Sequence, residues 1–147
     1  MLAGKYPGAR REIEARTKVR ALVEAGVRTF VDLTEDGELL PYAHLLPAGV
    51  LHHRIPVRDI TCPSPLQVKE AVELIDLRSR VGVVYVHCWG GCGRTGVILG
   101  CYLVNCGATA DAALARIDEL TRVLWAKPCP ETSDQVRMIR RWSPTTG

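Results

Sequence analysis

The feature that most constrains the fold is a continuous apolar run, VGVVYVH at residues 81–87, followed at once by the glycine-rich segment CWGGCG. The run is rich in valine and lacks the polar alternation of a strand that has one face in water. Such a pattern is typical of a strand buried on both faces, as in parallel sheets covered by helices. Residues 95–105, beyond the glycines, are apolar nearly all round, which predicts a helix in the middle of the core. A buried strand, a glycine turn and a buried helix together predict an α/β domain.

Helical and strand patterns alternate along the rest of the chain. We expect a helix over residues 9–25, strands at 28–33 and 50–57, and helices that begin after Ser64, Thr109 and Thr132. Ser64 and Gln67 fit a capping box, and the apolar face of the helix after Thr109 runs as far as Leu124. Because no repeat or linker divides the chain, residues 1–147 are predicted to form a single domain. The predicted fold is a three-layer α/β arrangement, in which helices flank a central, mostly parallel sheet of four to five strands.

The composition excludes several classes of protein. Hydrophobic residues make up 47% of the chain and charged residues 24%, as in an ordinary globular protein. The net charge is +3 without a long block of lysines or arginines, so we expect no nucleic acid partner. The longest apolar run is too short to span a membrane and no signal-peptide core is present, so we expect a cytoplasmic protein that does not contact membranes. We also expect a monomer. The six cysteines are spaced unlike a secreted disulfide scaffold, which predicts free thiols.

The segment between the predicted strand and helix has the residue types that bind a phosphoryl group. Its glycines allow successive backbone N–H groups to converge on one point, and the helix N-terminus adds partial positive charge. Arg94 supplies a planar guanidinium that matches two phosphate oxygens. Cys88 lies at the base of this arrangement, where the positive field favours its thiolate for in-line attack. The alternative is that Cys88 is a buried structural cysteine and the glycines serve a tight turn.

Six positions match the pattern His-Cys-x-x-Gly-x-x-Arg-Thr-Gly: His87, Cys88, Gly91, Arg94, Thr95 and Gly96. This pattern resembles the phosphate loop of the cysteine-dependent protein tyrosine phosphatase superfamily. The short chain is similar to the dual-specificity and Cdc14-like branch, small prokaryotic members above all. The resemblance implies hydrolysis through a phosphocysteine intermediate, with no cofactor and no metal. It also implies a phosphate-binding loop made of Trp89, Gly90, Gly91, Cys92, Gly93 and Arg94.

The same resemblance implies a role for each residue around this loop. Cys88 is the nucleophile, and Arg94 binds the phosphoryl group and stabilises the transition state. Thr95 donates its hydroxyl to the sulfur as it leaves; it also fits a helix N-terminal cap, and both can hold. His87 either helps to maintain the thiolate of Cys88 or is a core histidine with no catalytic role.

A general acid is expected upstream of Cys88, because the departing alkoxide or phenoxide needs a proton. The segment PVRDITCPSP resembles the acid loop of the family, which implies that Asp59 is the acid, although Arg58 departs from the family's usual residue at that position. The alternative is that Asp59 caps a turn with Thr61. Asp32 and Asp36 are competing acids, of which Asp32 fits better as an organiser of a strand end.

Three further residues keep two interpretations each. The segment PETSDQ resembles the one in which Cdc14-like members place a glutamine that orients the attacking water, which implies this role for Gln135, with Asp59 as the base. Gln135 fits equally well as the partner of Thr132 in a capping box. Cys92 and Cys62 are candidates to trap an oxidised nucleophile as a disulfide, and the alternative is that both are small packing residues.

Together these residues predict a protein phosphatase for phosphotyrosine, and also for phosphoserine and phosphothreonine. One alternative is the same chemistry on a phosphoinositide, a nucleotide or an RNA 5′-phosphate. Another is a pseudophosphatase that binds phosphorylated proteins without turnover. Positions 89, 90, 92 and 93 carry no lysine, which weakens the case for a polyphosphoinositide.

Overall fold

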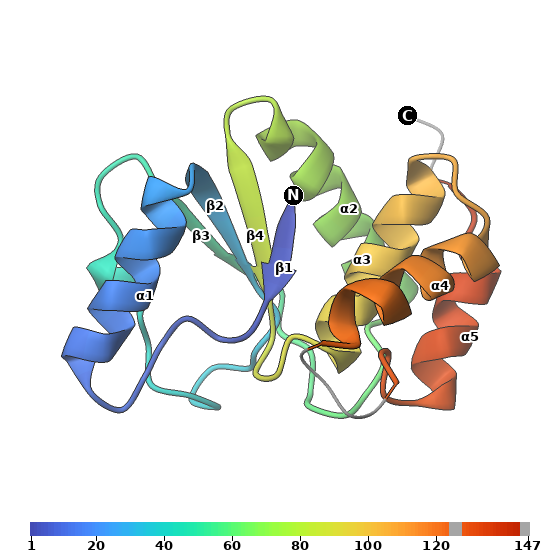
Figure 1. The fold of residues 1–147 in the computed structure, drawn as a ribbon, viewed down its shortest axis with the longest axis horizontal. Coiled ribbons are helices and arrows are strands. Elements are labelled where there is room, and N and C mark those ends of the chain that lie inside the picture. The colour runs from blue at the N-terminus through green and yellow to red at the C-terminus, as the bar shows by residue number, and fades with distance from the viewer. Residues whose placement is uncertain (124–127, 145–147) are drawn as a thin grey trace.

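The computed structural model describes residues 1–123 and 128–144 and contains one parallel sheet (Figure 1). Its strands are β1 (Leu2–Gly4), β2 (Val27–Asp32), β3 (Leu51–Arg54) and β4 (Val83–His87), in the order β1-β4-β2-β3. The valine-rich strand β4 therefore lies inside the sheet, between β1 and β2. This position explains why its sequence shows no exposed face.

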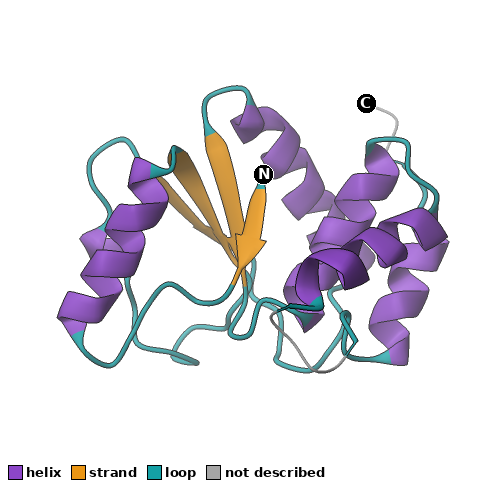
Figure 2. Cartoon of the chain, viewed as in Figure 1, coloured by secondary structure: helices purple, strands orange, loops and turns teal. Residues whose placement is uncertain are grey.

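Helices cover both faces of the sheet (Figures 1 and 2). The helices are α1 (Glu12–Glu24), α2 (Pro65–Ser79), α3 (Gly93–Asn105), α4 (Ala110–Thr121) and α5 (Ser133–Arg141), with a short 3₁₀ helix η1 (Ala43–Leu45). Helix α1 and η1 lie on one face, α2 and α3 lie on the other, and α4 and α5 pack against α3. The predicted three-layer α/β fold with a four-stranded parallel sheet is confirmed. None of the helices within 1–123 and 128–144 has the length and hydropathy that a membrane span requires.

The boundaries of helices and strands differ from the predicted ones where tertiary contacts, rather than local sequence, determine where an element begins or ends. Strand β1 was not predicted, because three residues carry no readable pattern. The first helix begins at Glu12 rather than at residue 9, because the preceding segment runs along the phosphate loop, where Tyr6 N–H donates to the Trp89 carbonyl at 3.1 Å. The regular strand predicted to continue to residue 57 ends at Arg54. The predicted contribution of Leu124 lies outside the described residues.

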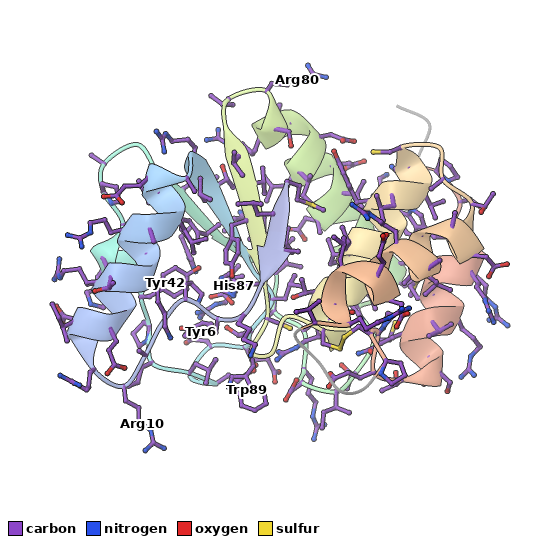
Figure 3. All side chains as sticks on the ribbon, in the orientation of Figure 1. Tyr6, Arg10, Tyr42, Arg80, His87 and Trp89 are labelled. Atoms are coloured by element: carbon purple, nitrogen blue, oxygen red, sulfur yellow. A yellow bond between two sulfur atoms is a disulfide. The ribbon has the colours of Figure 1, made fainter. Side chains whose placement is uncertain are left out.

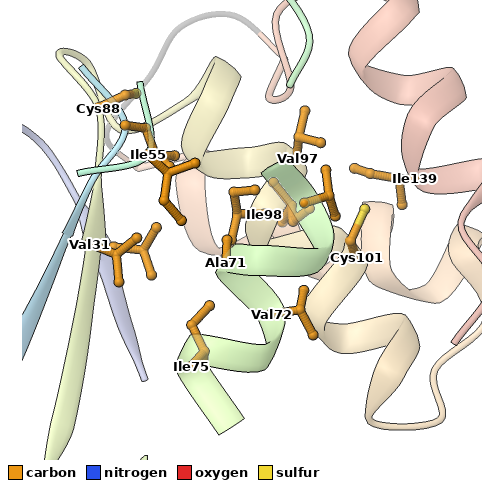
Figure 4. Packing of buried hydrophobic residues seen from close by; sticks show 14 of the residues in the cluster. Val31, Ile55, Ala71, Val72, Ile75, Cys88, Val97, Ile98, Cys101 and Ile139 are labelled. Atoms are coloured by element: carbon orange, nitrogen blue, oxygen red, sulfur yellow. The ribbon is translucent and has the colours of Figure 1, made fainter. Parts of the chain in front are cut away.

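The main core lies between the sheet and the helix layer made of α2 and α3. Val84 and Val86 of β4 point into this core, whereas Tyr85 between them packs on the α1 side, so the strand is buried on both faces. Figure 4 shows residues of α2 and α3 that meet there, among them Val72 and Ile98, both with no exposed surface. The nearly all-round apolar pattern of residues 95–105 thus matches a helix that packs against the sheet and three other helices.

Because all strand pairs are parallel, the carboxyl ends of the strands meet at one edge of the sheet. The segments that leave this edge are residues 5–11, 33–42, 55–64 and 88–92. In open α/β sheets this edge is where ligands bind. The glycine-rich segment and the predicted acid therefore reach the same place from different strands.

Candidate active site

The phosphate loop, residues 88–94, runs from the end of β4 into the first turn of α3. Gly91 donates its backbone N–H to the Cys88 sulfur, with 3.2 Å between the atoms. Gly91 has a φ of +77°, and a Cβ there would lie 2.5 Å from the carbonyl carbon of Gly4. Only glycine fits this position without moving β1. The sequence pattern of glycines around Cys88 therefore reflects close backbone packing as well as loop curvature.

Arg94 is buried, with 1% of its surface exposed, and loops from two other strands hold its guanidinium. Its Nη1 donates to the carbonyls of Val57 at 2.8 Å and Leu33 at 3.3 Å. Glu38 accepts from both terminal nitrogens, at 2.9 Å from Nη1 and 2.8 Å from Nη2. The Oδ1 atom of Asp59 lies 2.8 Å from Nη2. Arg94 thus has a fixed orientation at the carboxyl edge of the sheet.

Glu38 is a residue of the site that the sequence did not reveal. It belongs to the turn EDGE, in which only Asp36 was considered, and Asp36 instead pairs with Arg54 at 2.9 Å. Burial opposes ionisation of Glu38, but its hydrogen bonds from Arg94 hold its pKa below the usual range. The carboxylate is therefore a permanent partner of the arginine. The sequence shows only that Glu38 is an acidic residue in the loop after a buried strand. Such residues are too common for this feature to identify a functional one.

Asp59, the predicted acid, lies beside Arg94, as its assigned role requires. Its side chain is 48% exposed and belongs to the acid loop, residues 57–63. The next residue, Ile60, has a φ of +65°, a left-handed conformation that is uncommon for a β-branched side chain. Thr61 donates its hydroxyl to the Arg58 carbonyl at 2.7 Å, which closes the turn around Asp59. The acid role of Asp59 stays a prediction.

Gln135 is buried and connects the start of α5 to the acid loop. Its Oε1 accepts from the N–H groups of Glu131 and Thr132 at 2.9 and 3.2 Å, and the Thr132 hydroxyl accepts from the Gln135 N–H, which completes the capping box. Its Nε2 donates to the Thr61 carbonyl at 3.0 Å. A Cβ at Gly93 would lie 3.0 Å from the same Nε2, so the side chain also borders the phosphate loop. The capping interpretation is therefore realised, and the water-orienting one stays a prediction.

A buried polar network supports His87, the residue before Cys88. His87 has no exposed surface, and its Nε2 lies 2.6 Å from the hydroxyl oxygen of Tyr42 (Figure 3). Burial lowers the pKa of His87 to about 4, so its ring is neutral near pH 7. Asp32 lies at the end of β2, where burial would raise its pKa, but the hydrogen bond with His52 and the proximity of His87 hold that pKa below its usual range. Asp32 also binds Arg54 at 3.0 Å and thus organises a strand end, as expected.

The hydrogen bond expected from Thr95 to the Cys88 sulfur is not formed. The Thr95 side chain is buried, and its hydroxyl oxygen has no hydrogen-bond partner within residues 1–123 and 128–144. Cys92, not Thr95, is the residue that immediately precedes α3, so Thr95 does not cap this helix. Its role in the departure of the sulfur stays a prediction.

The cysteines pair in a way that the sequence did not indicate. Cys92 forms a disulfide with Cys129, across a sequence separation of 37 residues and with 5.2 Å between their Cα atoms. The expectation that all six thiols are free is wrong for these two, and Cys92 is not available to trap an oxidised Cys88. The reason is that the segment before α5 folds back against the phosphate loop, a contact that depends on tertiary structure. Cys62, the other redox candidate, is free and half-buried, and burial raises its pKa.

Comparisons with known proteins agree with this geometry. A family model described as "Tc-R-P: Polymorphic toxin system, DSP-PTPase phosphatase" matches residues 5–108. The chain is 29% identical over 140 residues to the "Putative tyrosine phosphatase 067L" of Invertebrate iridescent virus 3, covering 85% of this chain and 57% of the viral one. It is 35% identical over 93 residues to the phosphatidylglycerophosphate phosphatase PTPMT2 of Arabidopsis thaliana, covering 61% of this chain and 41% of the plant one. The chain therefore spans little more than half of the viral relative and less than half of the plant one.

The fold has a close counterpart among solved structures. The crystal structure of Tk-PTP in its active form superposes with a TM-score of 0.73 at 25% identity, covering 95% of each chain. The similarity extends over the sheet and the helices on both of its faces, since almost the whole chain is covered. The arrangement of strand, phosphate loop and helix is thus part of a shared architecture.

Proposed function

Because the chain belongs to the DSP-PTPase phosphatases of polymorphic toxin systems, within the cysteine-dependent tyrosine and dual-specificity phosphatases, we propose that it hydrolyses phosphotyrosine in proteins. Phosphoserine and phosphothreonine are further substrates in this proposal. The reaction proceeds through a phosphocysteine on Cys88. The chemistry requires neither a metal nor a cofactor, since thiolate, arginine and carboxylate supply every role.

The observation that carries the proposal is the buried Nε donor that Arg94 leaves unused. Its Nη1 is occupied by two backbone carbonyls and by Glu38, whereas its Nε is buried without a hydrogen-bond partner within residues 1–123 and 128–144. A buried N–H without a partner costs free energy, unless a ligand supplies the acceptor. A phosphoryl oxygen bound by Nε, with a second one at Nη2 once Asp59 has turned away from that nitrogen, gives the bidentate geometry that a guanidinium favours.

In the first step the Cys88 sulfur attacks phosphorus in line with the leaving oxygen. The backbone N–H groups of the phosphate loop and the N-terminus of α3 stabilise negative charge on the equatorial oxygens. Asp59, which lies against Arg94 Nη2, turns to the leaving oxygen and protonates it. Its half-exposed position in a loop with a left-handed residue fits a side chain that changes partners.

In the second step water attacks the phosphocysteine. Asp59, now ionised, accepts a proton from this water. Gln135 lies between the acid loop and Gly93, and its Nε2 carries a second N–H besides the one given to Thr61. That N–H is suited to orient the water, and the Thr95 hydroxyl is suited to donate to the departing sulfur.

Two variants test this mechanism with an aryl phosphate and with phosphotyrosine peptides. Cys88→Ser is expected to abolish phosphate release while circular dichroism shows a folded protein, and Cys106→Ser, at an exposed free cysteine, serves as its matched control. Asp59→Asn is expected to slow esters of poor leaving groups by about 10²- to 10⁴-fold and activated aryl esters much less. Near-normal turnover by Cys88→Ser would rule out the mechanism, and equal losses on all esters would remove Asp59 as the acid.

A second candidate function is the same chemistry on a non-protein phosphate ester. It is favoured by the similarity to PTPMT2, which is named for phosphatidylglycerophosphate, although the chain covers only 41% of that protein. A panel of phosphopeptides, phosphatidylglycerophosphate and a 5′-phosphorylated oligonucleotide separates the candidates by kcat/KM. Binding of phosphopeptides without saturable phosphate release would instead identify a pseudophosphatase.

The cytoplasmic location predicted from the sequence stays a proposal, and the disulfide is the observation against it. Cytosolic proteins are kept reduced, whereas structural disulfides are typical of oxidising compartments. Rapid alkylation of the protein in its native setting distinguishes the two, because six free thiols are expected in the cytosol and four where Cys92 and Cys129 are bonded.

A further inference from the structure

A concave site adjoins the phosphate loop, and its cationic side chains are not used by the mechanism above. This basic groove has a volume of about 690 Å³, and its walls come from the segment after β1, from α1, from the loop after β2 and from the phosphate loop. The side chains on which the argument depends are Lys5, Arg10, Lys18, Glu38 and Trp89. The groove therefore begins at the mouth of the phosphate loop and extends towards α1.

The charge of the basic groove is unbalanced in favour of cations. Lys5, Arg10 and Lys18 line it, and Glu38, the one acid among the described lining residues, is already bonded to Arg94. Within residues 1–123 and 128–144, neither Arg10 nor Lys18 forms an ion pair; the ammonium of Lys18 has only a long contact of 3.5 Å with the Gly8 carbonyl. Such a cluster favours an anion over any neutral occupant.

The walls of the groove are tied to the active site and to one another. Tyr6 donates its N–H to the Trp89 carbonyl at 3.1 Å and its hydroxyl to the Leu40 carbonyl at 2.7 Å. Tyr85 of β4 donates its hydroxyl to the Lys5 carbonyl at 2.6 Å. Backbone and side-chain hydrogen bonds thus hold the segment after β1 in place. A groove held in this way presents its cations without first having to order a loop.

The cations of the groove lie outside the phosphate loop. The loop has no lysine or arginine at positions 89–93, and the groove's cations come instead from the segment after β1 and from α1. Trp89, which lines the groove with them, is 61% exposed. Figure 3 shows Trp89 and Arg10 along the same edge of the molecule. A second phosphate on a compact ring that carries the scissile one would stay close to Cys88. An anion that reaches the groove must be joined to the scissile phosphate by a longer, extended chain.

We propose that the basic groove binds a second anionic group of an extended phosphopeptide while its phosphorylated residue occupies the phosphate loop. This inference rests on the proposed protein phosphatase activity and adds a substrate class to it. The second group is a side-chain carboxylate or a second phosphate a few residues from the scissile one. Both are anions with several acceptor oxygens, and Arg10 and Lys18 attract both.

The test compares three phosphotyrosine peptides of one length: one with neutral flanks, one with aspartate flanks, and one with a second phosphorylated residue. We expect a higher kcat/KM for the two anionic peptides, through KM, and a loss of this advantage as salt increases. Exposed ion pairs contribute modestly, so the Arg10→Ala/Lys18→Ala variant is expected to reduce the anionic-to-neutral ratio by about ten-fold or less, towards one. The difference between the aspartate and diphosphorylated peptides identifies the preferred anion.

Arg80→Ala provides the matched control, since Arg80 is exposed and lies at the opposite edge of the molecule (Figure 3). This variant is expected to keep the wild-type ratio. Equal kcat/KM for all three peptides in the wild type, or an unchanged ratio in the Arg10→Ala/Lys18→Ala variant, would overturn the groove proposal and leave the protein phosphatase activity standing. Turnover of the aryl phosphate with no hydrolysis of any phosphopeptide would instead overturn the proposed function, and the groove proposal with it.

Discussion

Removal of the Cys92–Cys129 disulfide gives the sharpest test of the tertiary structure. The bond joins the phosphate loop to the segment before α5, and the chain that it closes contains α3 and α4. The perturbation is Cys129→Ser, because Cys129 lies outside the phosphate loop and its replacement leaves the loop sequence intact. A serine is close in size to the cysteine, so the lost covalent bond is the dominant change.

The expected magnitude follows from the length of chain that the bond closes. A cross-link mainly lowers the conformational entropy of the unfolded chain, by an amount that grows with the logarithm of the loop length. For a sequence separation of 37 residues, this relation predicts a stabilisation of about 4 kcal/mol at 25 °C. Such a loss corresponds to a shift of about 2 M in the urea midpoint and of about 10 °C in Tm.

The assay is urea unfolding of the oxidised protein, followed by far-ultraviolet circular dichroism, with and without reductant. Cys129→Ser is expected to unfold at the lower midpoint in both conditions, and reduced wild type should approach it. Cys106→Ser, which removes an exposed free thiol, should match oxidised wild type. If oxidised wild type and Cys129→Ser unfold at the same urea concentration, the Cys92–Cys129 bond does not stabilise the folded protein and the reasoning is refuted.

Three further predictions address single side chains. Glu38→Gln removes the carboxylate that holds both terminal nitrogens of Arg94. Steady-state kinetics should therefore show kcat/KM for an aryl phosphate lowered by about 10- to 100-fold. An unchanged value would contradict the positioning role of Glu38. Ile60→Asn should raise the free energy of unfolding by about 1 kcal/mol, because asparagine tolerates a φ of +65° better than isoleucine does. The exposed Ile60 side chain loses little apolar burial in this change. A urea midpoint below that of the wild type would contradict the prediction. His87 has a folded-state pKa of about 4, below its ordinary value of about 6.5, so the unfolded chain takes up the proton first as pH falls. The contribution of His87 to the free energy of unfolding is therefore expected to be complete above pH ~6.5 and to fall by up to about 1.4 kcal/mol per pH unit towards pH 4. The free energy of unfolding of His87→Gln should fall less steeply over this range. Equal slopes for the two proteins would refute the assignment.

Much of the candidate active site was predictable because its signals are local. The valine run of β4, the glycines after Cys88 and the all-round apolar pattern of α3 each depend on neighbours within a few residues. Their order along the chain predicted a buried strand, a sharp loop and a helix N-terminus, and the fold contains all three. The proximity of Asp59 to Arg94 also follows from sequence order, since both segments leave carboxyl ends of strands in one parallel sheet.

The residues that were missed depend on contacts between distant segments. Glu38 lies 56 positions from Arg94, and nothing around the EDGE turn distinguishes it from the acids beside it. Cys129 lies outside any recognisable motif, and its pairing with Cys92 requires the chain to return over α3 and α4. The three cations of the basic groove come from the segment after β1 and from α1, so no local pattern connects them with Trp89.

The amino-acid sequence thus determined the fold class and the family, and it singled out Cys88 as the proposed nucleophile and Arg94 as the proposed phosphate-binding residue, because hydrophobic periodicity and a short glycine-rich motif act over a few residues. The tertiary structure alone decided which carboxylate orients Arg94, which thiols are bonded and which cations line the basic groove. These properties depend on distances between segments that only packing brings together. Residues from distant segments come together in this chain because the helices pack over the sheet, and no short stretch of sequence encodes that packing.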